Sequence, residues 1–380
     1  MSALYIHIPF CKQACYYCDF HFSTSLKRKD EMIVALVKEI ILRKDELKNK
    51  TIETIYFGGG TPSLLTIEEL QLLIDTIYKN YTVITNPEIT LEANPDDLSE
   101  KQIHNLSTTQ INRLSIGIQS FFDEDLAAMN RAHNSEEAKK CLSATIGSFD
   151  NITIDLIYGI PKMSNQRWQQ NLQIAFDFDV NHISSYALTV EPKTALANFI
   201  KKGKYPPVSE ELAAQHFKTL VAETKKQGFI QYEISNFGKP DYFSKHNTSY
   251  WQGKHYVGIG PSAHSYKGTH RSWNVSNNAK YLKAIQGGKL PQEIERLSLN
   301  DRFNETIMTG LRTVWGVSLA DIERDFGRDY KNGLLKNSEK FIVQKLLKKE
   351  YDIHQDKDIL KITEKGKFLC DGIASSLFKI

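Results

Sequence analysis

The chain has 380 residues, of which 41% are hydrophobic and 24% are charged. A chain of this length buries at least one large core, and we expect one main domain with one or two smaller parts. Its 48 basic and 45 acidic side chains leave a formal charge of only +3, which excludes a strongly basic surface and predicts no nucleic-acid partner.

Six short apolar runs alternate with longer segments of helical periodicity along residues 1–237. Such alternation is typical of repeated βα units, which build a parallel barrel or an open fragment of one. In these folds the chemistry lies on the loops that follow the carboxyl ends of the strands. The predicted strands cover residues 4–8, 54–57, 89–93, 113–118, 153–158 and 182–188.

Two of the predicted helices have clear start signals. Thr66 and Glu69 form a capping-box pattern, which predicts a helix that reaches about residue 78. Ser209 and Glu211 predict the start of another, which reaches about residue 226 and stops at Gly228.

The rest of the chain differs in character. Residues 238–297 are rich in aromatic residues, His, Gly, Asn and Ser without a clear period, which predicts a loop-rich segment. Residues 298–380 predict a small, mainly helical, winged-helix-like domain. Its predicted elements are helices over 302–313 and 339–348 and a strand over 359–363 before a final helix.

The cysteines and the apolar segments indicate the compartment. The apolar start, residues 3–10, lacks a basic leader, and no apolar run approaches the roughly 18 residues of a membrane span. Three of the five cysteines lie between residues 11 and 18, which fits a metal site better than a disulfide framework. Cys141 and Cys370 are interpreted as small buried hydrophobic residues. We therefore expect a cytoplasmic protein.

The strongest signal is the loop after the first strand, which carries Cys11, Cys15 and Cys18. Three thiolates can bind three irons of a [4Fe-4S] cluster and leave the fourth iron open to the amino and carboxylate groups of S-adenosylmethionine. The chemistry would then belong to the cofactor, while the protein positions and shields it. Taken alone, the loop also fits a zinc site, because His21 would complete a Cys3His ligand set.

Further polar residues lie at the ends of the later strands. Gly60 and Thr61 follow the second strand, Glu92 and Gln119 lie at the ends of the third and fourth, and Asp155 lies within the fifth. Each alone has an ordinary explanation as a turn, a cap or a satisfied buried group. Together they indicate a single ligand pocket, which a zinc site on the loop would not require.

With these motifs the sequence resembles the coproporphyrinogen-dehydrogenase-like branch of the radical S-adenosylmethionine superfamily along nearly its whole length. The resemblance is carried by residues 5–11, 56–62, 113–119 and 155–161. It implies a partial (β/α)6 TIM-like barrel of radical-SAM type with a small C-terminal accessory domain. It also implies S-adenosylmethionine contacts from Tyr5, Tyr17, Gly60, Thr61, Glu92, Gln119, Arg131, Asp155 and Thr189.

This branch contains both an oxygen-independent coproporphyrinogen III dehydrogenase and haem chaperones. The dehydrogenase has a further cysteine two positions after the third ligand and an N-terminal extension. This chain instead has Phe20 at that position and four residues before Tyr5. Residues 246–251 also resemble the haem-binding signature of the chaperones. We therefore favour a haem chaperone, with the dehydrogenase as the weaker alternative.

The residues with which this chaperone would hold haem are His246, Tyr250 and Trp251. An imidazole can ligate haem iron while aromatic rings pack on the porphyrin, although a satisfied histidine beside core aromatics is the plainer interpretation. His264, in a loop near the expected barrel mouth, is a second candidate ligand. The resemblance further implies haem as cargo, an acceptor haemoprotein and an electron donor such as flavodoxin or ferredoxin, and it is compatible with a homodimer.

Overall fold

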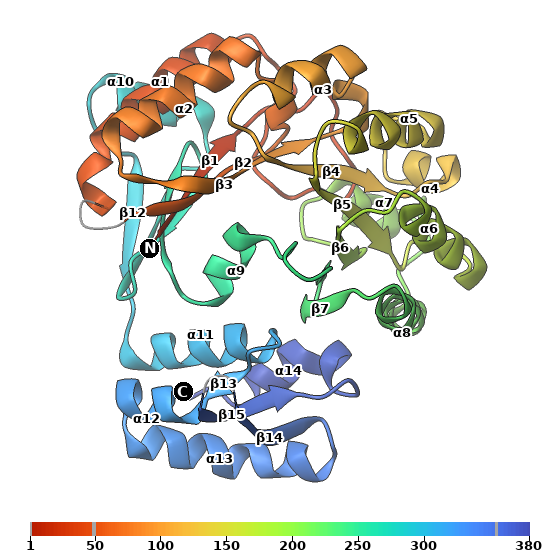
Figure 1. Cartoon of the computed structure of the whole chain (residues 1–380), viewed down its shortest axis with the longest axis vertical. Coiled ribbons are helices and arrows are strands. Elements are labelled where there is room, and N and C mark those ends of the chain that lie inside the picture. The colour runs from red at the N-terminus through yellow and green to blue at the C-terminus, as the bar shows by residue number, and fades with distance from the viewer. Residues whose placement is uncertain (1, 48–50, 354–355) are drawn as a thin grey trace.

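The computed structural model describes residues 2–47, 51–353 and 356–380, which form a curved β-sheet wrapped by helices and a smaller C-terminal domain beneath it (Figure 1). The strands of the large sheet are β1 (Ser2–Ile8), β2 (Ile52–Gly59), β3 (Val83–Ala93), β4 (Arg113–Gln119), β5 (Asn151–Tyr158), β6 (His182–Ala187), β7 (Ile230–Glu233), β8 (Asn236–Gly238), β9 (His255–Ile259), β10 (His264–Tyr266), β11 (His270–Asn274) and β12 (Gln292–Arg296).

The order of these strands is β12-β11-β10-β9-β1-β2-β3-β4-β5-β6-β8-β7. From β9 to β6 each strand pairs in parallel with its neighbour, and the strands at both edges pair antiparallel. The six predicted strands are therefore confirmed, as is the partial α/β barrel. Their apolar residues are buried on both faces, as parallel sheets covered by helices require.

The helices of the barrel lie mainly on the outer face of the sheet (Figure 1). They are α1 (Lys29–Leu42), α2 (Ile67–Asn80), α3 (Glu100–Ser107), α4 (Asp123–Ala128), α5 (Ser135–Ile146), α6 (Asn165–Asp177), α7 (Ala195–Lys201) and α8 (Glu210–Lys226), with short 3-10 turns η1 (Lys44–Leu47), η2 (Pro62–Leu64) and η3 (Pro95–Asp97). The predicted starts of α2 and α8 are confirmed. Thr66 and Glu69 cap each other reciprocally, and the Ser209 hydroxyl accepts the Leu212 N–H at 3.1 Å.

Residues 238–297 are more regular than the sequence predicts. They contain α9 (Lys245–Trp251), α10 (Asn278–Gln286) and the strands β9 to β12. The strand β9 pairs with β1 as a seventh parallel strand, so this segment extends the sheet instead of covering it with loops. These strands are short and half-polar; β9 pairs with β1, and β10, β11 and β12 follow it by successive antiparallel pairing. Figure 1 shows α9 on the inner side of the curved sheet, facing the C-terminal domain.

The C-terminal domain has its own core and is mainly helical, as predicted. Its elements are α11 (Leu299–Leu311), α12 (Leu319–Phe326), α13 (Arg328–Val343), η4 (Lys367–Leu369), α14 (Cys370–Ser375) and a sheet in the order β13 (Val317–Ser318), β15 (Lys357–Ile362), β14 (Leu347–Asp352). The predicted helix over 339–348 is partly wrong. Lys345 has a φ of 59°, and this left-handed residue ends the helical turn so that the chain can enter β14.

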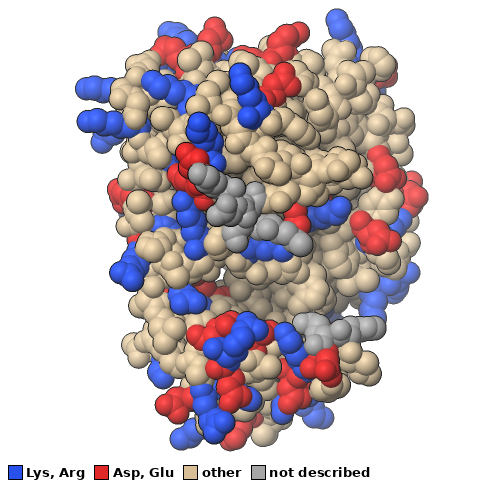
Figure 2. Space-filling view, turned by 60° about the vertical axis from the view of Figure 1, so that its left-hand side comes forward, with Lys and Arg blue, Asp and Glu red and all other residues tan. Residues whose placement is uncertain are grey.

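The surface mixes both signs of charge. On the face in Figure 2, lysine and arginine side chains are interspersed with aspartate and glutamate over both the barrel and the C-terminal domain. Within residues 2–47, 51–353 and 356–380, no helix has the length and apolar character of a membrane span.

Candidate cofactor site

The loop with the three cysteines leaves the carboxyl end of β1 and is closed by backbone hydrogen bonds. The Ser23 N–H donates to the Pro9 carbonyl at 2.9 Å, and the Cys11 N–H donates to the Ser23 carbonyl at 3.1 Å. Within the loop, the Cys18 N–H donates to the Cys15 carbonyl at 3.3 Å. All three thiols are partly exposed and face the same cavity.

The segment before α5 holds this loop from the side. The Gln13 amide donates to the Asn130 carbonyl at 2.9 Å, and the Asn130 amide donates to the Ala14 carbonyl at 2.7 Å. The Tyr16 N–H also donates to the Met129 carbonyl at 3.1 Å. These reciprocal contacts fix the backbone between the cysteines, and so preorganise the thiols.

The cavity has a volume of about 410 Å³ and lies at the carboxyl ends of the parallel strands. It brings together most of the residues that the sequence analysis singled out for the cofactor, namely Cys11, Cys15, Tyr17, Cys18, Gly60, Thr61, Glu92, Gln119, Arg131, Asp155 and Thr189. Tyr5 does not line it. The Tyr5 hydroxyl bonds to His7 Nδ1 at 3.2 Å, and its ring stacks on Tyr56 beside the cavity floor.

Gly60 shows why a residue without a Cβ is needed after β2. A Cβ there would lie 2.5 Å from the Phe10 carbonyl oxygen and 2.8 Å from that of Ile8. The Gly60 N–H donates to Ile8 and the Thr61 N–H to Phe10, at 2.9 and 2.7 Å. The glycine therefore allows the loop after β2 to pack directly on the start of the cysteine loop, at the wall of the cavity.

Four acidic residues line the cavity, Asp19, Glu92, Asp155 and Glu191, and two of them belong to the parallel strands, Glu92 to β3 and Asp155 to β5. Glu92 accepts hydrogen bonds from the Tyr56 hydroxyl at 2.8 Å and from the Gly59 N–H at 3.2 Å. Removal from bulk water raises the pKa of Glu92 to about 7 and that of Asp155 to about 6. Such shifts are typical of sites that bind or react with a ligand, and a cationic ligand would favour the ionised forms.

Arg131 forms the basic side. Its guanidinium donates to Asn94 Oδ1 at 2.6 Å, to the Gly117 carbonyl at 2.8 Å and to Cys15 Sγ at 3.4 Å. Its Nε is buried and has no hydrogen-bond partner. A buried donor without a partner in a ligand cavity fits an incoming anionic group, such as a carboxylate.

The zinc alternative requires His21 beside the three thiols, and the structure does not place it there. Burial raises the pKa of Cys18 to about 11, so a bound metal has to displace its proton. His21, the fourth ligand of the zinc alternative, bonds through Nε2 to Asn278 Oδ1 at 2.7 Å. Within the described ranges, no three His, Cys, Asp or Glu side chains lie close enough to hold one metal ion. The Cys3His set is therefore not formed.

His246 is a buried histidine with both ring nitrogens engaged. Its Nδ1 bonds to the Thr54 hydroxyl and its Nε2 to the Tyr250 hydroxyl, each at 2.7 Å. The ring is 1% exposed and stacks on Tyr56, and burial lowers its pKa to about 3. The structure therefore agrees with the plainer interpretation of this residue: it presents no free nitrogen to haem iron while α9 is docked.

The other two haem candidates also lie outside the cofactor cavity. The ring of Trp251 packs under Arg312, whose guanidinium carbon lies 5.3 Å from the ring centroid. His264 is exposed on β10 and its ring centroid lies 6.0 Å from that of Trp273. The four haem candidates are thus not gathered into one site in this structure.

Several cavity residues were missed by the sequence analysis. Ser115 and Gly117 line the cavity from β4, and Asn94 contacts both Arg131 and Thr61. The two β4 residues could have been found, since they share a strand face with Gln119 by the period of two. Asn94 follows Glu92 by two residues at the end of β3, so the same period could have indicated it.

Two family models match the sequence. The radical SAM superfamily model matches residues 5–174, and the HemN C-terminal domain model matches residues 297–369. The chain is 34% identical over 374 residues to the heme chaperone HemW of Bacillus subtilis (strain 168), covering 97% of each chain. It is 32% identical over 382 residues to the heme chaperone HemW of Lactococcus lactis subsp. lactis (strain IL1403), covering 98% of each.

Among solved structures, the coproporphyrinogen III oxidase HemN of Escherichia coli superposes with a TM-score of 0.85 at 22% identity, covering 100% of this chain and 90% of that one. This likeness shows the shared fold of barrel and C-terminal domain. Because curated relatives are more than 30% identical over nearly their whole length, the chain belongs to the HemW family of haem chaperones within the radical SAM superfamily.

Proposed function

We propose that this protein binds a [4Fe-4S] cluster, S-adenosylmethionine and haem, and delivers the haem to an acceptor haemoprotein. The observation that carries the proposal is the single cavity that joins three cysteines to an unpaired arginine donor and two carboxyl groups. An electron donor such as flavodoxin or ferredoxin belongs to the same proposal, since the cluster has to be reduced.

The residues of the cavity fit the two cofactors. Cys11, Cys15 and Cys18 would hold three irons, and Arg131 would pair with the methionine carboxylate. Glu92 and Asp155 would face the cationic parts of S-adenosylmethionine. When bound, the reduced cluster supplies an electron to the sulfonium, while these side chains bind and orient the cofactor.

The haem part of the proposal is supported by the names of the relatives and by the segment of α9. His264 is the candidate imidazole that is exposed as the protein stands, whereas His246 becomes available only if α9 leaves the inner face of the sheet. We therefore propose His264 as the ligand of first contact, with the ring of Trp273 beside it.

A haem titration tests the function directly. The wild-type protein is expected to shift the Soret band of added haem, and His264→Ala is expected to weaken this binding. The variant His246→Ala should still bind haem, because in the structure both ring nitrogens of His246 are hydrogen-bonded within the protein and are not available to iron. Loss of haem only in His246→Ala would instead show that α9 opens for haem. A wild-type protein without any Soret shift would contradict the proposed function.

The same preparation separates the chaperone from the dehydrogenase. With a reconstituted cluster, S-adenosylmethionine and a reductant, we expect no conversion of coproporphyrinogen III. Formation of protoporphyrinogen would favour the dehydrogenase. It would also show that the activity does not need a cysteine at position 20, where this chain has an exposed phenylalanine that lines the cavity.

A further inference from the structure

Arg113, the first residue of β4, points into the barrel beneath the cofactor cavity. Ser115, Gly117 and Gln119 of the same strand line the cavity, and residues two apart lie on one face of a strand. Arg113 is 1% exposed and is one of the largest fully buried side chains. A full positive charge is therefore enclosed next to the acidic side of the cavity.

This arginine has fewer partners than a buried guanidinium normally needs. Its Nη2 donates to the Thr153 hydroxyl, and its Nε is buried without a hydrogen-bond partner. Across the described part of the chain, no acidic side chain forms an ion pair with it. Burying an unpaired cation costs several kcal/mol, so its retention calls for a compensating role.

Titratable groups face this interior from every surrounding element. They are Tyr5 on β1, Tyr56 on β2, Glu88 and Glu92 on β3, Asp155 on β5, His182 and Tyr186 on β6, Tyr232 and Glu233 on β7, His246 and Tyr250 on α9, and Arg131 before α5. Loss of solvation raises the pKa of the tyrosines and lowers the pKa of the histidines, so the tyrosines and histidines of this set are uncharged near pH 7.

Two of the four acids in this interior are bound by groups outside the cofactor cavity. Glu88 accepts the N–H groups of Lys245 and His246 at 3.0 and 2.9 Å. Glu233 accepts from Arg312 at 2.7 Å. Glu92 and Asp155 line the cofactor cavity and lie on the same inner face as Arg113. Arg113 is paired with Thr90, two residues before Glu92 on β3, and its hydrogen-bond partner Thr153 lies two residues before Asp155 on β5.

We propose that Arg113 is a positioning residue whose positive charge favours the carboxylate forms of Glu92 and Asp155, so that the floor of the cavity can offer negative charge to a cationic ligand. The identity of that ligand as S-adenosylmethionine rests on the proposed function. The role of Arg113 toward the two carboxyl groups does not, because it follows from the arrangement of the charges themselves.

The electrostatic directions agree with this role. The positive charge of Arg113 lowers the pKa of both carboxyl groups, against the larger effect of desolvation. With Arg113 present these pKa values are about 7 and about 6, close to neutral pH. Removing the cation is therefore expected to raise both pKa values further and to increase the protonated fraction of both groups at pH 7.

The first test measures protonation without any ligand. The infrared band of protonated carboxyl groups is titrated from about pH 5 to about pH 9 in the wild type, R113M and R113K, with Glu92→Gln to assign the band. We expect the midpoint to rise by about one pH unit or more in R113M and to stay near the wild-type value in R113K. Thr153→Val, which removes the hydrogen-bond partner but keeps the charge, should also titrate as the wild type.

The second test uses S-adenosylmethionine as the probe, with the reconstituted protein. Wild-type affinity should rise with pH through about 6 to 7, because both carboxyl groups lose their protons there. In R113M the affinity should fall about tenfold at pH 7 and recover by about pH 9. A wild-type protein that does not bind S-adenosylmethionine would contradict the proposed function, while the infrared midpoints would still decide the role of Arg113.

An unchanged midpoint in folded R113M would overturn the proposal. If R113M does not fold, the double variant R113M/D155N tests the proposal in its place. In this variant the loss of the Asp155 carboxylate offsets the loss of the Arg113 cation, so the net charge of the interior is preserved. A folded double variant would support the proposal, and an unfolded one would show that Arg113 has a purely structural role.

Discussion

Cys11→Ala is expected to abolish the cluster. In protein reconstituted anaerobically with iron and sulfide, the iron content should fall from about four atoms per chain to near zero, and the visible absorbance should disappear. The reason is geometric, since the three thiols of one loop face one cavity, and a cluster held by three thiolates would lose one of its protein ligands. Iron and sulfide analysis with visible spectroscopy measures the effect.

The chain offers a matched control for this substitution. Cys141 and Cys370 are buried at 3% and 2% exposure and do not line the cavity, so their replacement by alanine should leave the iron content unchanged. Full iron retention in Cys11→Ala would contradict the ligand assignment. A colourless wild-type protein with one zinc per chain would instead support a zinc site.

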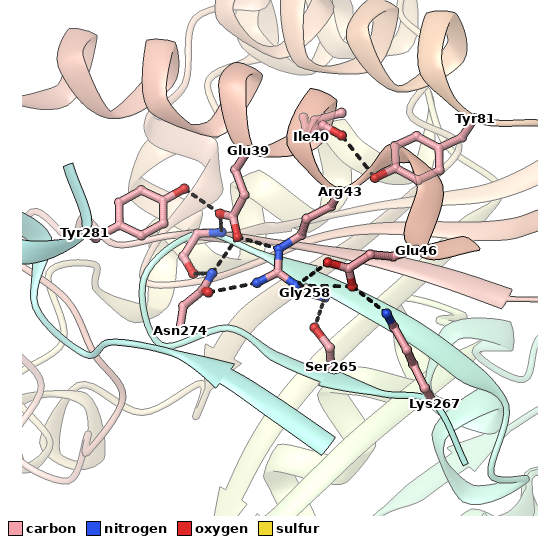
Figure 3. Close-up of polar contacts among 11 residues, drawn as sticks. Glu39, Ile40, Arg43, Glu46, Tyr81, Gly258, Ser265, Lys267, Asn274 and Tyr281 are labelled. Carbon is pink, nitrogen blue, oxygen red and sulfur yellow. Dashed lines mark hydrogen bonds and ion pairs between the residues drawn. The ribbon is translucent and has the colours of Figure 1, made fainter. Parts of the chain in front are cut away.

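Arg43→Met is expected to cause the largest loss of stability. Arg43 and Glu39 of α1 form an ion pair at 2.7 Å with 1% and 0% side-chain exposure. Figure 3 shows that Glu39 also accepts the Tyr281 hydroxyl, and that Arg43 reaches Asn274, so the pair joins α1 to the strands after β9 and to α10. Without Arg43, a buried carboxylate loses its cation, which should lower the free energy of unfolding by about 3–5 kcal/mol.

Denaturant unfolding measures this loss, and two variants control for it. Arg28→Met breaks an exposed ion pair with Glu31, which has side-chain exposures of 45% and 47%, and should cost about 0–1 kcal/mol. The double variant Glu39→Gln/Arg43→Met should be more stable than Arg43→Met alone, because it no longer buries an unpaired charge. Equal losses in Arg43→Met and Arg28→Met would show that the network around Arg43 contributes little.

The network around Arg43 also bears on the cofactor loop. The Gly260 N–H donates to Glu39 at 2.8 Å, and a Cβ at Gly260 would lie 2.6 Å from the His7 carbonyl oxygen. The same region continues to Asn278, which bonds to His21 at the end of the cysteine loop. Residues 238–297, for which the sequence showed no clear period, thus support the cysteine loop, which was the strongest signal in the sequence.

What the sequence predicts well is what periodicity and local spacing encode. The strands β1 to β6 are long apolar runs, and the cysteine loop is a local motif on the first of them, so both were predictable from the residues alone. The short strands β9 to β12 depend on pairing with distant partners, and α9 begins where Glu88 of β3 accepts its first N–H groups. Such contacts between distant residues leave no periodic trace.

The site shows the same division. Residues at strand ends, such as Glu92 and Gln119, were predictable because a parallel barrel gathers them at one edge. Tyr5 belongs to the family motif, yet it packs on Tyr56 and does not reach the cavity. His246 belongs to the haem-binding pattern, but burial and two hydrogen bonds hold it inside the fold. A motif predicts which residue types are present, whereas burial decides whether they are accessible.

The most direct measurement is electron paramagnetic resonance of the reduced, reconstituted protein before and after addition of S-adenosylmethionine. Cys11, Cys15 and Cys18 lie at the wall of the cavity that contains Arg131, Glu92 and Asp155. If these residues hold both cofactors as proposed, S-adenosylmethionine should change the cluster signal, because it would bind at the iron that no cysteine occupies. A cluster signal that stays the same at saturating S-adenosylmethionine would contradict the shared site.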